Sequence, residues 1–81
     1  MADNKSLKSL QEEENKKAGM LFQQARHKKG LSQEDLSYQA GIEQSTLSKV
    51  ERLGPKDVSW QKLCSIAETM GYIVEINLRH I

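Results

Sequence analysis

The clearest hydrophobic pattern in this chain is a pair of short helical repeats on either side of a glycine. Leu36 and Ala40 lie one helical turn apart, and Leu47 and Val50 repeat the pattern after Gly41. A glycine at this place suits the left-handed conformation that ends many helices. The pattern therefore predicts two short amphipathic helices joined by a tight turn.

Polar residues mark where these two helices begin and which way their outer faces point. Ser32 is an N-cap candidate, with Asp35 three residues later in an arrangement close to a capping box. The second helix is expected to begin near Gln44, and burial of its apolar side leaves a polar side outward. Two short helices, a glycine turn and a polar outer face describe a helix-turn-helix. The outward residues of the second helix are Ser45, Ser48, Lys49 and Arg52.

Two further apolar stripes flank this pair and predict two more helices. The first runs from residue 16 to 29 and stops before Gly30, and the second runs from 59 to 70 and stops at Gly71. Trp60 begins the second stripe, so we expect it to anchor the core. The apolar members are Leu21, Phe22 and Ala25 in the first stripe, and Leu63, Ile66, Ala67 and Met70 in the second.

The last ten residues change from helical spacing to alternation, which predicts a β-strand. They are rich in β-branched residues, and apolar side chains recur at every second position. No other segment looks like a strand, and a lone strand leaves its backbone groups unpaired. We therefore expect it to pair with the same strand of a second copy across a two-fold axis. The alternative is an extended tail lying on its own domain. The residues expected to form the dimer contact are Tyr72, Val74, Ile76 and Leu78.

Length and composition indicate one small domain. The chain has 81 residues, of which 37% are hydrophobic, and it has no apolar run long enough for a membrane span. The N-terminus lacks a signal-peptide apolar core, and a single cysteine suits a reducing compartment, so we expect a cytoplasmic protein. The expected divisions are a flexible polar N-terminal arm at 1–15, a helix-turn-helix domain at 16–71 and a dimerisation strand at 72–81.

The distribution of charge changes the picture more than the net charge of +1 does. Residues 1–15 have two lysines against four acids, a net of −2, and residues 53–81 are balanced. Residues 16–52 have seven Lys or Arg against four acids, a net of +3. The positive excess therefore lies on the helix-turn-helix half, which favours an anionic partner.

The stretch LSQEDLSYQAGIEQSTLSKVER resembles the repressor-type helix-turn-helix of phage repressor and Cro proteins, a group that includes xenobiotic-response-element-like bacterial regulators. The resemblance covers roughly residues 18 to 71. Ser37 stands where the family usually has Ala, and Glu43 where it usually has a capping Ser or Asp. The tail is similar to that of an antitoxin-like subgroup with a C-terminal strand. The resemblance implies a mostly α, five-helix repressor-like domain with one C-terminal β-strand that pairs across a homodimer. The residues that carry it are Leu31-Ser32-Gln33, Ala40-Gly41-Ile42, Ser45, Leu47-Ser48 and Val50-Glu51.

The resemblance also implies roles for individual residues. Gln33 would contact phosphate and brace Gln44, and an ion pair would join Arg26 to Glu51. Gln44, Ser45 and Ser48 would face base edges in the major groove of double-stranded DNA. Thr46, Lys49 and Arg52 would contact phosphates, which set register and salt sensitivity.

The expected function is that of a sequence-specific double-stranded DNA-binding transcriptional regulator, a homodimeric repressor on a palindromic operator. An antitoxin that also binds a toxin protein is the alternative from another class. A restriction–modification controller is a third, against which the predicted strand argues. His27 and His80 are far apart in the sequence and have no second ligand pair, so we expect no metal site. No Ser/His/Asp, Cys/His or phosphate-loop spacing appears, so we expect no cofactor and no enzymatic activity.

Overall fold

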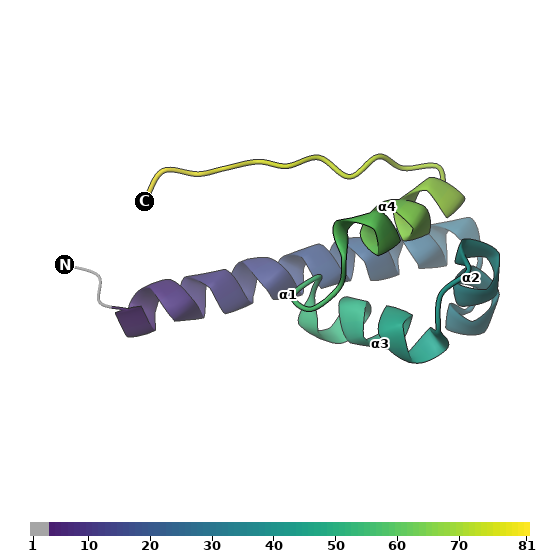
Figure 1. Cartoon of the computed structure of the whole chain (residues 1–81), viewed down its shortest axis with the longest axis horizontal. Helices are drawn as coiled ribbons and strands as arrows, with labels where there is room; N and C mark the ends of the chain where they lie inside the picture. The colour runs from purple at the N-terminus through teal and green to yellow at the C-terminus, as the bar shows by residue number, and fades with distance from the viewer. Residues whose placement is uncertain (1–3) are drawn as a thin grey trace.

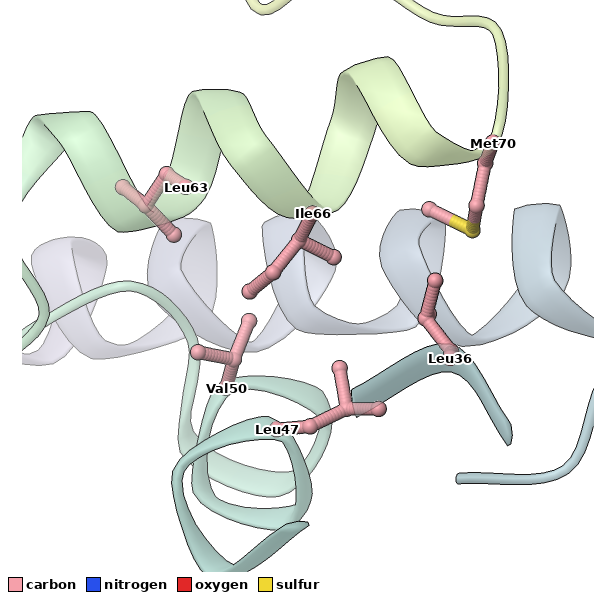
Figure 2. Packing of buried hydrophobic residues seen from close by; sticks show 6 residues of the cluster. All are labelled: Leu36, Leu47, Val50, Leu63, Ile66 and Met70. Carbon is pink, nitrogen blue, oxygen red and sulfur yellow. The ribbon is translucent and has the colours of Figure 1, made fainter. Parts of the chain in front are cut away.

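The computed structural model describes residues 4–81, and within them the chain forms four α-helices (Figure 1). The long first helix runs the length of the molecule, and the third and fourth helices lie against it with their apolar sides turned toward each other (Figure 1 and Figure 2). The second helix contacts both the third and the fourth. Among these residues no helix has the length and apolarity needed to cross a membrane. The helices are α1 (Asn4–Lys29), α2 (Gln33–Ala40), α3 (Gln44–Leu53) and α4 (Trp60–Thr69).

The local signals for helix ends are confirmed. The Ser32 hydroxyl accepts a hydrogen bond from the Asp35 amide at 3.0 Å, and the Ser59 hydroxyl caps α4 in the same way. Gly41 ends α2 with φ 70°, in the left-handed region. Glu43 precedes α3 with no side-chain capping bond, so α3 begins on backbone geometry alone.

The core is a single cluster in which α2, α3 and α4 meet against α1 (Figure 2). Phe22 and Ala25 of α1 pack against it and are half-buried. Trp60 was expected in this core, but its side chain is 50% exposed because it is the first residue of α4, beyond the buried part of the stripe. Leu21 is 66% exposed. The cluster consists of Leu36, Leu47, Val50, Leu63, Ile66 and Met70.

The expected fold is correct in its α-helical class and wrong in two details. The described residues form four helices instead of five, since only four apolar stripes have helical period. They contain no strand: residues 72–81 are extended, but no segment lies beside them to complete a β ladder (Figure 1). Residues 4–15 are the N-terminal half of α1. The division into arm, domain and tail stays a prediction.

Two glycines bring α1 into backbone contact with the end of α3. A Cβ atom on Gly19 would lie 2.5 Å from the Val50 carbonyl oxygen, closer than real Cβ atoms approach. A Cβ atom on Gly54 would overlap the Asn15 carbonyl, and Gly54 has φ 91°. Only glycine fits at either position, so the two helix backbones are as close as sterics allow.

A buried ion pair makes the same connection through side chains. Arg26 Nε of α1 donates to Glu51 Oε2 of α3 at 2.7 Å, and Arg26 Nη2 donates to Glu51 Oε1 at 3.0 Å. The third guanidinium nitrogen, Nη1, donates to the Leu31 carbonyl at 2.8 Å. Arg26 is 7% and Glu51 5% exposed, so each charge depends on the other for compensation.

We predict that Arg26→Ala or Glu51→Ala lowers the free energy of unfolding by about 3–5 kcal/mol, because either change leaves one buried charge without its partner. Urea unfolding of the parent, both single variants and the double variant gives the coupling energy. The exposed Glu14–Lys17 pair, with Nζ and Oε1 3.5 Å apart, is the control, and its loss should cost less than about 1 kcal/mol. A coupling energy near zero for Arg26 and Glu51 would contradict the assignment.

Candidate nucleic-acid interface

The outer face of α3 is polar and open to solvent, opposite the face that enters the core. Leu47 and Val50 are completely buried, and they fix the rotation of the helix about its axis. The remaining positions of the helix then point outward, as helical period requires. Gln44, Ser45, Lys49 and Arg52 are exposed, and Thr46 and Ser48 are half-buried.

Only weak, local hydrogen bonds hold these outer side chains. Ser45 Oγ donates to Glu43 Oε2 at 3.4 Å, and Arg52 Nε donates to Ser48 Oγ at 3.4 Å. Both bonds are exposed and longer than the usual range, so they compete poorly with new partners. Side chains held in this way are free to exchange their bonds for bonds to a ligand.

The side-chain amide of Gln33 joins the buried ion pair. Its Nε2 donates to Glu51 Oε1 at 3.1 Å, and its side chain is half-buried. Within the described residues no hydrogen bond links Gln33 to Gln44. Gln33 therefore connects the first turn of α2 to the same carboxylate that Arg26 binds.

A polar hollow of about 320 Å³ lies beside the outer face of α3, where the loop leads into α4. Thr46 and Lys49 line it from α3, and Lys62 lines it from the first turn of α4. Sequence reasoning missed Lys62. The signal available was a lysine three residues after the N-cap Ser59, at a helix start where the macrodipole adds positive potential. The hollow thus extends the polar outer face beyond α3, with Lys49 and Lys62 balanced in charge by Glu43 and Asp57.

The tail residues singled out in the sequence lie apart from this face. The tail leaves the end of α4 and runs back along α1 toward its N-terminal half (Figure 1). Arg79 Nη1 lies 3.9 Å from Glu14 Oε1, an exposed pair. Val74 is half-buried, whereas Tyr72, Ile76 and Leu78 are 45%, 73% and 91% exposed. The structure therefore has two separate surfaces, the α3 face and the tail face.

Comparison with known proteins identifies the family. A family model described as a helix-turn-helix domain matches residues 17–72, which include α2, the turn and α3. Neither the curated proteins nor the solved structures that were searched gave a match. Since the matched span is more than half of the chain, this protein belongs to the helix-turn-helix domain family, a family of DNA-binding domains.

Proposed function

We propose that this chain is a sequence-specific double-stranded DNA-binding transcriptional regulator that acts as a homodimeric repressor on a palindromic operator. The observation that carries the proposal is the outer face of α3. It is exposed, polar and basic, and it belongs to a helix whose other face is completely buried. Such a helix fits the major groove as a rigid unit.

The side chains on this face divide into two groups by chemistry. Gln44, Ser45 and Ser48 have donors and acceptors suited to base edges, and a glutamine pairs bidentately with adenine. Thr46, Lys49 and Arg52 suit phosphates, which fix register without reading sequence. Gln33 has its amide on Glu51, so its second N–H is the group available for a phosphate at the start of α2.

A homodimer supplies what one small domain lacks. A single recognition helix reads only a few base pairs, whereas two helices held about 34 Å apart read two half-sites one DNA turn apart. Linking two half-site contacts increases avidity by about 10²–10⁴ over either alone. The alternating tail at 72–78 supports the dimer, since its apolar side chains are largely uncovered in one chain.

We predict that Gln44→Ala weakens binding to a selected operator by about 1–3 kcal/mol and relaxes the preference at one base position, because a bidentate base contact is lost. Binding-site selection followed by titration of matched and mismatched duplexes measures both effects. Unchanged affinity and unchanged preference would mean that another face of α3 meets DNA.

Lys49→Ala is the matched contrast on the same helix. It removes a phosphate contact, so it should weaken specific and non-specific duplexes alike and lower the salt slope by about 1 per subunit. A changed base preference with an unchanged slope would make Lys49 a base-reading residue.

We predict that Ile76→Lys converts the dimer to monomer and lowers operator affinity, because it places a charge among the apolar tail contacts. Glu75→Lys, on the opposite face of the tail, should have a smaller effect. Sedimentation equilibrium and operator titration compare the two variants with the parent and with a chain ending at Gly71. A truncated chain that remains dimeric would move the dimer contact elsewhere, most plausibly to α4.

The antitoxin function is the second candidate, and one observation favours it. Residues Lys8 to Glu14 of α1 are all exposed and extend as a helix beyond the contact between Asn15 and Gly54. A free helical surface outside the domain suits a protein partner such as a toxin.

We predict that removing residues 1–11 leaves operator binding unchanged and, in the antitoxin case, abolishes binding to the product of the neighbouring gene. Copurification of the two proteins and operator titration measure the two functions separately. A full-length chain that does not bind that product would leave the plain repressor as the function.

A further inference from the structure

The tail presents a row of backbone groups with no backbone partner. The Tyr72 amide bonds to the Ala67 carbonyl at 2.9 Å, and after it no tail residue takes part in a backbone–backbone hydrogen bond among the described residues. Val74 is half-buried, whereas Ile76 and Leu78 are 73% and 91% exposed, so the tail lies against the domain near Val74 and is open to solvent beyond it. An extended segment with a free edge and a two-sided pattern is suited to pairing with another strand.

An uncovered apolar groove of about 430 Å³ lies between this tail and the domain. Leu21, Phe22 and Ala25 of α1 form one wall, and Tyr72 and Val74 form part of the other. Leu21 is 66% exposed, although it lies on the apolar stripe of α1. The groove is therefore an apolar surface next to the core that no side chain of the described residues covers.

The sequence of the tail is self-complementary in one antiparallel register. Two strands related by a two-fold axis through a residue n pair residue n − k with residue n + k of the other copy. An axis at Asn77 places Glu75 opposite Arg79 twice, by symmetry. On the other face it places Ile76 opposite Leu78, also twice. Cross-strand pairs of opposite charge, and apolar pairs, stabilise a sheet.

The neighbouring registers lack this match. An axis at Ile76 keeps an apolar pair, Val74 against Leu78, but it sets Glu75 against Asn77 and Ile73 against Arg79, so the pairing of opposite charges is lost. An axis at Glu75 sets two glutamates against each other, and like charges directly opposite are destabilising. The exposed contact of Arg79 with Glu14 in one chain does not prevent the exchange, since both side chains are at least half exposed to solvent.

We propose that the occupant of this tail edge and groove is the tail of a second copy, in the register with its two-fold axis at Asn77. This inference rests on the proposed homodimer. It adds the register of the paired strands and their seat, by which we mean the groove on α1 that they cover. In this register the partner's Leu78 lies beside Ile76, and the paired tails cover the groove that Leu21 lines. The site is isologous, so each copy supplies a groove and the strand that fills the other groove.

Charge reversal tests the register on the full chain. Glu75→Arg gives a tail with two basic groups, and Arg79→Glu gives a tail with two acidic groups. Each variant alone should dissociate at about tenfold higher concentration than the parent, because two attractive pairs become repulsive. An equimolar mixture should form heterodimers of near-parental stability, since both pairs are again complementary. Native mass spectrometry of the mixture and sedimentation equilibrium of each chain measure these outcomes.

The matched control places the same charge changes outside the tail. Glu34→Arg and Lys56→Glu are on exposed positions outside the tail and α4, so they should form homodimers and heterodimers without preference. A monomeric parent would overturn the homodimer itself. A dimeric parent with tail variants that mix at random would overturn the register and leave the homodimer intact.

The seat on α1 is tested by two adjacent residues of similar exposure. Leu21→Lys should weaken the dimer by about tenfold or more, because it places a charge in the groove. Met20→Lys should leave dimerisation unchanged, since Met20 is 52% exposed but does not line the groove. Equal effects of the two variants would overturn the seat.

Discussion

The buried ion pair between Arg26 and Glu51 is the constraint on which the arrangement of the helices depends. Its guanidinium reaches the Leu31 carbonyl in the turn before α2, and its carboxylate also accepts a bond from Gln33. One pair of charges thus connects α1, the entry to α2 and the last turn of α3. Because both groups are nearly excluded from water, separating the helices would leave each charge buried without its partner.

The outer face of α3 follows from this constraint together with the core. Leu47 and Val50 set the rotation of α3, while Glu51 sets its position along α1. The residues left outside are then those whose chemistry suits DNA. On this helix the side chains proposed to face bases are therefore different residues from Leu47, Val50 and Glu51, which hold the fold.

Sequence reasoning succeeded where the signal was local and failed where it depended on neighbours in space. The caps at Ser32 and Ser59 and the turn at Gly41 are each set by a few residues, and all three were predictable. Trp60 has the right spacing for the core, but spacing does not reveal that the apolar stripe of α4 extends beyond the part that other helices cover. The bond from Gln33 to Glu51 joins residues 18 apart, so no local pattern contains it. The pairing of Arg26 with Glu51 came from the family resemblance. The tail has the alternation of a strand, yet a ladder needs a second strand, which one chain does not contain.

The backbone contact at Gly19 has a mechanical consequence. α1 is a straight rod of about 39 Å, given its 26 residues. Near its midpoint, at Gly19, it contacts the backbone of α3 with no side chain between the two backbones. At this contact the two helices move as one body. A force on the N-terminal half of α1 is therefore passed directly to α3, the helix proposed to bind DNA.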